Sequence, residues 1–320
     1  AFRSYKKLSL HRIEQIIYQE NMRTTHYVSV LSIFLIASCT KSEVLYVASD
    51  YAYVGTFTQG LEGPAVDQKG NLYFVNPDHS GTIGKIDVSG NYTLFIDQLP
   101  EGSTANGIRI NERGMLFLAD YTGHNVLEVD PETKAVSVYA HEPSANQPND
   151  LTLGVGDLLF ASDPNWGAST GKIWRIEKGQ FILMADGMGT TNGIEISPDG
   201  KTLYVNESVQ RNVWAFDITE SKTLANKRLL ISFPDFGMDG MRCDVKGNLY
   251  ITRYGKGTVV KVSPGGDVLK EIELIGKKAS NIAFGGPNGT TAYVTLQDRG
   301  YIETFEVSDS GQWFDELKKN

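Results

Sequence analysis

The chain has 320 residues, of which 41% are hydrophobic and 21% are charged, and its formal net charge is −8 at pH 7. These proportions are ordinary for a globular protein. The acidic balance argues against a nucleic-acid-binding protein, which normally carries a basic patch or stripe along the phosphate backbone, so we expect no nucleic-acid partner.

Residues 1–39 are predicted to comprise an upstream extension and an export signal that lie outside the fold. From Met22 the chain reads MRTTHYVSVLSIFLIASC, a short basic start followed by an apolar core. The apolar core is too short to span a bilayer as a stable helix and is typical of a secretory signal. Its end resembles a bacterial lipoprotein signal, which predicts that Cys39 is lipidated. An ordinary signal peptide that happens to contain a cysteine is the alternative.

The lipoprotein interpretation predicts an exported protein of the bacterial cell envelope that faces the periplasm or the exterior. Membrane contact would be made only through the lipid on Cys39. Residues 1–21 precede a plausible start methionine, and we interpret them as translated upstream sequence or an overlong gene assignment. A short linker, residues 40–47, would follow the lipidated cysteine. The remaining cysteine, Cys243, lies in an apolar run and is expected to be an inert buried thiol.

Between about residue 62 and residue 307 the same pattern restarts six times, at steps of 42 to 47 residues. Each restart opens a short apolar stretch: EGPAV, NGIRI, NDLTL, NGIEI, DGMRC and NIAFG. A glycine-led second strand recurs as well, for example GNLYFV at 70 and GNLYIT at 247. A repeat of this length built from short strands is typical of a β-propeller. We therefore predict an all-β fold over residues 48–310, a six-bladed β-propeller of four-stranded antiparallel blades, followed by a C-terminal tail, residues 311–320.

The sixth repeat lacks a fourth strand, because only SDSGQWFDELKKN follows Val307. Residues 51–57, which precede the first repeat, have the character of a strand. We predict that this N-terminal strand completes the last blade, so that backbone hydrogen bonds join the two ends of the propeller and leave no open seam.

One polar residue occupies the same slot at every restart. Since the innermost strand of each blade lines the central channel, this slot places six oxygen-bearing side chains around one axis. The six are Glu62, Asn106, Asn149, Asn192, Asp239 and Asn281. Hard oxygen ligands suit calcium best, and the absence of histidine and cysteine from the ring argues against zinc.

The two carboxylates of this ring would be costly in a narrow channel without a counter-charge, and a bound divalent cation would remove that cost. We therefore predict a metal site formed by Glu62, Asn149, Asn192 and Asp239. Calcium is the expected ion, with Mn²⁺, Mg²⁺ and Zn²⁺ as alternatives. The competing interpretation is that these side chains only cap turns between blades.

The start of the first strand and the end of the second strand of each blade lie at the same mouth of the channel. The residues there form a predicted wall of substrate contacts: Asn106, Tyr121, His124, Asp163, Trp166 and Arg253. For His124 a plain loop position is the alternative, for Trp166 surface packing, and for Arg253 an ion pair with a nearby carboxylate. The opposite mouth carries turns such as QKGN and SPDG, which resemble plain solvent turns.

Five short motifs carry a family resemblance: EGP at 62, PND at 148, SDP at 162, TNGI at 191 and DGM at 239. In this order and spacing they resemble the gluconolactonase and regucalcin (senescence marker protein) family over roughly residues 48–307. The resemblance implies one divalent cation in the channel, with Glu62, Asn192 and Asp239 as ligands. Asn149 would be a fourth ligand or would contact metal-bound water or substrate. The resemblance also implies lactone hydrolysis with Asp239 as the catalytic general base.

One position departs from the family pattern. Many members have an arginine two residues before the blade-three asparagine, where this chain has Gln147. The departure leaves the metal site intact and leaves open whether the small-molecule substrate is a sugar-acid lactone. The leading hypothesis is a calcium-dependent hydrolase of the lactonase type. The alternatives are a non-enzymatic binding module of the cell envelope with a structural calcium, or a metal-dependent esterase or phosphoesterase.

Overall fold

The computed structural model describes residues 44–55, 57, 60–154 and 156–313 of the chain. The predicted export signal, including Cys39, lies outside these residues. Within the described ranges there is no helix with the length and apolar character needed to cross a membrane.

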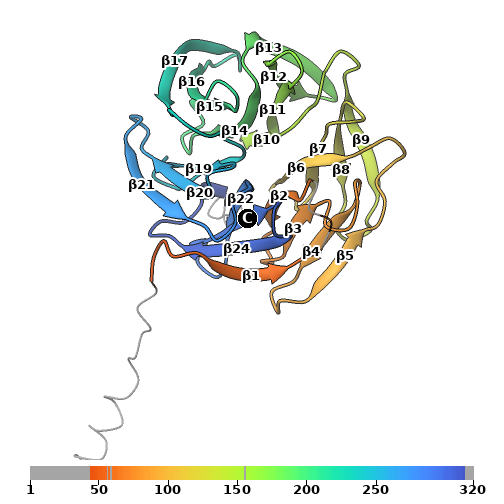
Figure 1. Ribbon diagram of the computed structural model, residues 1–320. Helices are drawn as coiled ribbons and strands as arrows, with labels where there is room; N and C mark the ends of the chain where they lie inside the picture. Colours follow the sequence, from red (N-terminus) through yellow and green to blue (C-terminus); the bar gives the residue numbers. More distant parts are fainter. Residues whose placement is uncertain (1–43, 56, 58–59, 155, 314–320) are drawn as a thin grey trace, which may run out of the picture. The chain divides into compact units, whose positions relative to one another are not determined.

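Six four-stranded antiparallel sheets are arranged around a common centre (Figure 1), which confirms the predicted six-bladed propeller. The strands of the first three blades, each from the inner to the outer edge, are β2 (Glu62–Val66), β3 (Leu72–Val75), β4 (Ile83–Ile86), β5 (Tyr92–Ile96); β6 (Ala105–Ile110), β7 (Leu116–Asp120), β8 (Asn125–Val129), β9 (Val136–His141); β10 (Leu151–Gly154), β11 (Leu158–Asn165), β12 (Thr170–Glu177), β13 (Gln180–Met188). Those of the last three are β14 (Thr191–Ile196), β15 (Thr202–Glu207), β16 (Asn212–Ile218), β17 (Leu224–Ser232); β18 (Met241–Cys243), β19 (Leu249–Arg253), β20 (Thr258–Val262), β21 (Val268–Glu273); β22 (Ala279–Gly285), β23 (Thr291–Leu296), β24 (Tyr301–Glu306), β1 (Ser49–Tyr53).

The outer strand of the sixth blade comes from the start of the propeller, as predicted. β1 pairs antiparallel with β24, and the register places Ser49 opposite Thr304 and Tyr53 opposite Tyr301. The strand begins before the predicted 51–57 segment and ends at Tyr53. The first and last parts of the propeller therefore share one sheet, and the backbone hydrogen bonds between β1 and β24 close the ring of blades.

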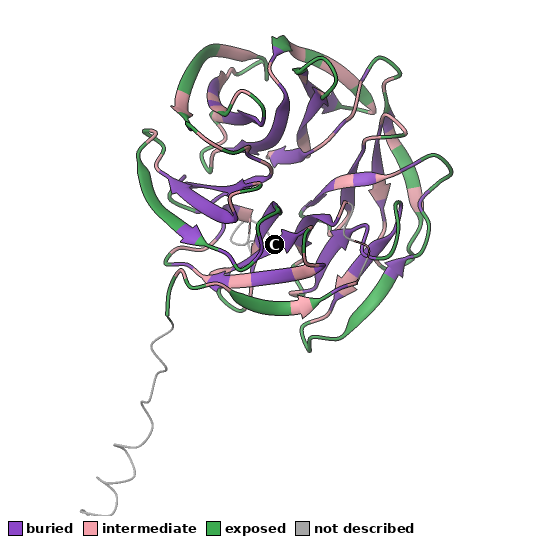
Figure 2. Ribbon diagram, in the orientation of Figure 1, coloured by how far each residue is buried: buried purple, intermediate pink, exposed green. Residues whose placement is uncertain are grey.

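Burial explains why the second strands of the blades are mostly apolar. Figure 2 shows buried residues on the strands toward the centre of the propeller and exposed residues on the outer strands. The central strand β19 is buried at every position, whereas β21 at the outer edge of the same blade is mostly exposed. Neighbouring blades cover the second strands on both faces, so these strands have mostly apolar side chains on both faces.

A glycine follows the slot residue in four of the six blades because neighbouring inner strands approach closely there. A β-carbon at Gly63 would collide with the carbonyl oxygen of Asn106 in the next blade, and one at Gly193 would collide with the carbonyl oxygen of Asp239. Gly63 also has a φ of +57°, a region that favours glycine. These glycines therefore let each slot residue lie directly beside the next.

The C-terminal segment closes one mouth of the channel. Val245 N donates to Ser310 O at 2.9 Å, and Gly311 N donates to Gly289 O at 3.0 Å. Gln312 Nε2 donates to Ile196 O at 2.7 Å and also contacts the Glu195 carboxylate. The sequence predicts plain solvent turns at this mouth and a tail over residues 311–320. In the structure Gly311 and Gln312 are buried against the inner strands there, and the cavity lined by the slot residues opens at the opposite mouth.

Candidate functional site

A cavity of about 690 Å³ opens at the mouth where the inner strands begin. Five of the six slot residues line it, namely Glu62, Asn106, Asn149, Asn192 and Asp239. Its size lies within the range of small-molecule binding sites. The structure therefore brings together all four predicted metal ligands and places them at the base of a cavity that admits a small molecule.

Three of the predicted ligands present buried oxygens that have no hydrogen-bond partner: Glu62 Oε1, Asn149 Oδ1 and Asn192 Oδ1. An unsatisfied buried polar group costs about 1–3 kcal/mol, so native proteins rarely keep one without a reason. Three such oxygens from three different blades, next to the Asp239 carboxylate, form a donor set that suits a hard divalent cation. The described part of the chain has no group of three or more His, Cys, Asp or Glu side chains that could hold a metal ion. The candidate set is instead two carboxylates and two amides.

The orientation of Asn192 is set by its neighbours. Asn192 Nδ2 donates to Ser208 Oγ at 3.1 Å, and Ser208 Oγ in turn donates to the carbonyl oxygen of Met238. Since these contacts hold the amide nitrogen, the amide oxygen faces away from them. Asp239 is fixed through its backbone: its N–H donates to Thr252 O at 3.1 Å, and its carbonyl oxygen accepts from Asn206 Nδ2 at 2.6 Å.

The two carboxyl groups of the site have raised pKa values. Burial is the main cause of the rise in the pKa of Asp239 to about 8, which the interaction with Asn192 partly offsets. Burial, followed by the negative charge of Asp239, raises the pKa of Glu62 well above its usual range. A positive charge placed between the two carboxyl groups would therefore stabilise their ionised forms and lower both pKa values.

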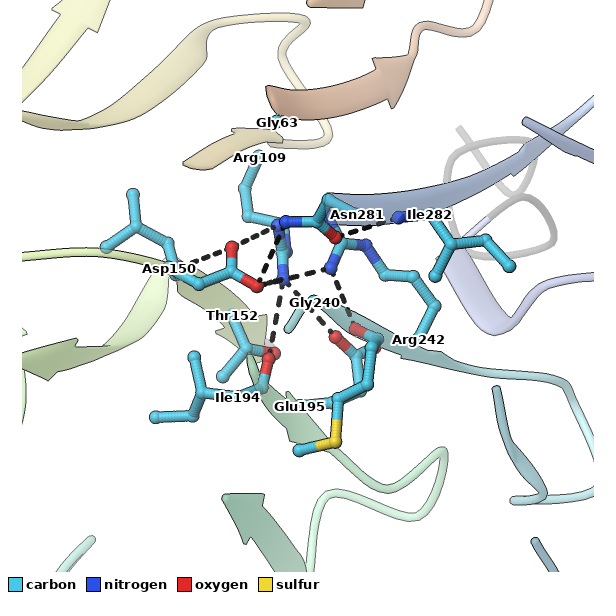
Figure 3. A network of polar contacts seen from close by, with 12 residues as sticks. Gly63, Arg109, Asp150, Thr152, Ile194, Glu195, Gly240, Arg242, Asn281 and Ile282 are labelled. Atoms are coloured by element: carbon cyan, nitrogen blue, oxygen red, sulfur yellow. Dashed lines mark hydrogen bonds and ion pairs between the residues drawn. The ribbon is translucent and has the colours of Figure 1, made fainter. Parts of the chain in front are cut away.

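Below the cavity lies a buried ionic network (Figure 3) that was not predicted from the sequence. Arg109 Nη1 lies 3.0 Å from Asp150 Oδ1, and Arg242 Nη1 lies 3.5 Å from Asp150 Oδ2. Arg109 Nη2 lies 3.6 Å from Glu195 Oε2. The sixth slot residue, Asn281, contacts this network, since its Nδ2 lies 3.5 Å from Asp150 Oδ2, and it does not line the cavity.

A periodic signal for this network is present in the sequence. Arg109, Glu195 and Arg242 each lie three residues after a slot residue, in NGIR, NGIE and DGMR. Burial, followed by the charge of Arg109, lowers the pKa of Arg242 to about 10. Arg109 and Arg242 line a separate cavity of about 60 Å³ together with Gln312 and Trp313. The network thus forms the floor between the closed mouth and the substrate cavity.

The predicted substrate-contacting residues divide into two groups. Asn106, Tyr121 and Trp166 line the cavity, and the side chain of Trp166 is 45% exposed at its edge. Gln147, which replaces the arginine common in the resembling family, lines it too.

Asp163, Arg253 and His124 are not among the described residues that line this cavity. Asp163 is buried, accepts a hydrogen bond from Asn146 N at 2.9 Å and another from Trp174 Nε1 at 2.8 Å, and so ties down the loop before β10. The placement at the end of a second strand was correct, but the side chain turns toward the loop rather than the channel.

Arg253 and His124 make contacts that stabilise the fold outside the cavity. Arg253 Nη2 lies 2.8 Å from Asp235 Oδ1, and its guanidinium carbon lies 4.0 Å from the centre of the Phe233 ring. It therefore braces the segment that leads to Asp239. His124 has a φ of +59° in the turn between β7 and β8, and its carbonyl oxygen accepts from Glu142 N at 3.1 Å.

Several residues of the cavity wall were not anticipated, among them Arg211, Phe236 and Tyr254. Arg211 and Phe236 come from loops, where no periodic pattern marks them. Tyr254 directly follows β19, and its hydroxyl donates to Gln297 Oε1 at 3.1 Å. Its place at the end of a second strand is the signal that could have identified it.

Comparison with known proteins agrees with this geometry. Residues 53–298 match the family described as the SMP-30/Gluconolactonase/LRE-like region. The chain is 24% identical over 288 residues to a protein named gluconolactonase from Zymomonas mobilis, with 79% of this chain and 80% of that protein covered. It is 26% identical over 287 residues to diisopropyl-fluorophosphatase from Loligo vulgaris, with coverage of 79% and 90%.

A solved structure shows the same fold. The structure described as a calcium-binding protein, regucalcin, from Agrobacterium tumefaciens superimposes with a TM-score of 0.72 at 20% sequence identity. The match covers 83% of this chain and 95% of that one.

Proposed function

The chain belongs to the SMP-30/gluconolactonase/LRE-like family of lactonase-type hydrolases, and we propose that it opens the ring of a small lactone with the help of a divalent cation. One observation carries the proposal. Three partnerless buried oxygens, on Glu62, Asn149 and Asn192, converge with Asp239 at the base of a cavity large enough for a small molecule.

Calcium is the proposed ion. Carboxylate and amide oxygens are ligands that calcium prefers, and the proposed ligand set contains no nitrogen or sulfur ligand of the kind that zinc favours. The related fold described as a calcium-binding protein supports the same choice. Mn²⁺, Mg²⁺ and Zn²⁺ are the alternatives that a metal-exchange experiment would compare.

The proposed chemistry assigns Asp239 the central role. Glu62, Asn149, Asn192 and Asp239 would hold a divalent cation, which would supply a Lewis acid for the lactone carbonyl. The Asp239 carboxylate accepts a proton from the water whose oxygen attacks the carbonyl carbon. When the ring C–O bond breaks, the proton passes from Asp239 to the departing alkoxide oxygen, and the product is a hydroxy acid. Asn106 and Gln147 line the cavity with amide groups that can orient the substrate by hydrogen bonds.

The open cavity favours an enzyme over a non-enzymatic binding module with a structural calcium. A purely structural ion would be enclosed by protein oxygens, whereas Asn149 and Asp239 are only partly buried and line a cavity of about 690 Å³. The relative from Loligo vulgaris, whose printed name denotes a fluorophosphatase, makes metal-dependent hydrolysis at a phosphorus centre the second candidate.

Export and lipid anchoring through Cys39 are part of the proposal. The support is the sequence that ends in Ile36-Ala37-Ser38-Cys39. Mass spectrometry of the mature N-terminus from a bacterial host tests it. A diacylated Cys39 is expected, and an unmodified N-terminus elsewhere would leave the protein without this anchor.

The function is tested by activity on a panel of substrates. The protein from Lys41 onward is stripped of metal and assayed on lactones, carboxylic esters and a fluorophosphate, first alone and then with calcium, manganese, magnesium or zinc. Lactone hydrolysis restored by calcium is the expected result. Restored activity on the fluorophosphate alone would favour the second candidate, and metal binding without turnover of any substrate would favour the binding module.

A further inference from the structure

Arg211 is the one cationic side chain among the described residues that line the substrate cavity. It lies in the turn between β15 and β16, and its side chain is exposed. The neighbouring arginine, Arg253, is already paired with Asp235 and buried. No ion pair or side-chain hydrogen bond of Arg211 is found within the described ranges, so its guanidinium is free to take a ligand.

The backbone of Arg211 is held firmly in an uncommon conformation. Its N–H donates to Glu207 O at 2.7 Å, and its carbonyl oxygen accepts from Phe233 N at 2.9 Å. Its φ is +61°, a region that non-glycine residues seldom adopt. His124 and Ser169 have φ values of +59° and +55° in the equivalent turns before β8 and β12, so this conformation belongs to the turn and holds the backbone of residue 211 in place.

With a divalent cation held by Glu62 and Asp239, Arg211 would carry the unpaired charge of the cavity. Glu62 and Asp239 are the carboxylates that line it, and a divalent cation would neutralise both. Arg211 then leaves an excess positive charge, in a protein whose overall formal charge is −8. A neutral lactone gives this charge no partner, whereas an anionic substituent would.

Two apolar side chains accompany Arg211 at the cavity edge. Val209 is 49% exposed and Phe236 is 48% exposed, and both line the same cavity. An exposed phenylalanine in the same cavity as an unpaired guanidinium offers a surface for the carbon skeleton that carries a charged group. Guanidinium groups bind carboxylate, phosphate and sulfonate oxygens through paired hydrogen bonds.

We propose that Arg211 is an anion subsite, and that the substrate is a lactone bearing a carboxylate, phosphate or sulfonate group away from the reacting ring. Arg211 binds that group while Val209 and Phe236 pack against the skeleton beside it. This substrate class rests on the proposed lactonase function. Arg211 determines specificity and takes no part in the bond-breaking step.

The test compares two lactones that share a ring and differ in charge, glucono-1,5-lactone and 6-phosphoglucono-1,5-lactone. The calcium-loaded full chain is assayed as wild type, Arg211→Gln and Arg211→Lys, with Arg113→Gln, an exposed arginine outside the cavity, as matched control. Arg211→Gln is expected to lower kcat/KM for the phosphorylated lactone by about tenfold or more, with little change for the neutral lactone and partial retention in Arg211→Lys. An equal effect on both lactones, or no effect on either, would overturn the subsite.

A binding measurement keeps this inference separate from the proposed function. If neither lactone is hydrolysed, the lactonase proposal fails, but calorimetry with 6-phosphogluconate and gluconate still decides the role of Arg211. A loss of affinity for 6-phosphogluconate alone in Arg211→Gln would support the subsite. Because phosphate can also contact calcium directly, the affinity of the wild type is compared with that of Arg211→Gln. Equal affinities for 6-phosphogluconate in the two proteins would refute the Arg211 subsite. Repeating the measurement with a sulfonated and a carboxylated sugar acid identifies the preferred anion.

Discussion

Glu62 of the first blade and Asp239 of the fifth blade place interacting carboxyl groups in one cavity at the centre of the propeller. Both must be ionised to hold a cation, yet burial raises the pKa of each of them. Protons and a divalent cation therefore compete for the same site. The stability of the folded protein should therefore depend on both pH and metal content.

The stability of the metal-free protein is expected to fall as pH rises from about 4 to about 8. The pKa of Asp239 is about 8 in the folded protein, compared with about 3.9 in an unfolded chain. Between these values the folded state keeps a proton that the unfolded state has released, so stability decreases with pH. Saturating calcium should remove the decline. Urea unfolding at both ends of the window, with calcium or with chelator, measures it.

The control for this prediction is Asp239→Asn, which cannot titrate and should show a smaller decline than the wild type in the absence of metal. Equal declines in the two proteins would assign the pH dependence to other groups.

Glu62→Gln is expected to weaken calcium binding by at least about tenfold, or 1.4 kcal/mol. The variant keeps the size of the side chain but removes one of the two charges that attract the cation. Calorimetric titration of the metal-free protein measures the affinity. Glu101→Gln, at an exposed glutamate outside the cavity, is the matched control and should bind as the wild type does. Unchanged affinity in Glu62→Gln would remove Glu62 from the ligand set.

Ser208→Ala is expected to weaken calcium binding by about tenfold, in the range seen when the partners that orient metal ligands are removed. Without its hydroxyl, the Asn192 amide loses the acceptor at 3.1 Å that holds its nitrogen. Titration with calcium tests this variant against Ser89→Ala, an exposed serine. If both serine variants bind calcium equally well, Ser208 has no orienting role.

Asp150→Asn is expected to destabilise the protein by about 3–5 kcal/mol, because Arg109 and Arg242 would be left as buried charges without full compensation. The free energy of unfolding in urea is the measurement. Asp217→Asn breaks an exposed pair with Arg228 and should destabilise the protein much less, because exposed ion pairs contribute little to stability. Comparable losses in the two variants would show that the network contributes little.

The repeat made the fold and the ring predictable from sequence. A period near 43 residues fixes the blade count, and the missing last strand identifies the N-terminal segment that closes the ring. The glycines after Glu62 and Asn192 allow the inner strands of neighbouring blades to approach closely, and this close approach brings the slot residues near one another.

The remaining features depend on the direction of individual side chains, which periodicity does not encode. Asp163 and Arg253 end second strands as expected, but they turn toward loops and bind there. Arg211 lies in a turn, so no strand pattern places it at the cavity. The insertion of Gln312 into the opposite mouth depends on contacts between residues far apart in sequence.

The central claim is that Asp239 and a divalent cation together hydrolyse a lactone. The most direct test is turnover of glucono-1,5-lactone and 6-phosphoglucono-1,5-lactone by metal-stripped wild type and Asp239→Asn, each assayed before and after saturation with calcium, with Asp97→Asn as an exposed control. We expect calcium to restore turnover in the wild type and the control, and Asp239→Asn to remain at least about a hundredfold slower while keeping its fold. Full activity of Asp239→Asn, or metal-independent turnover by the wild type, would contradict the account.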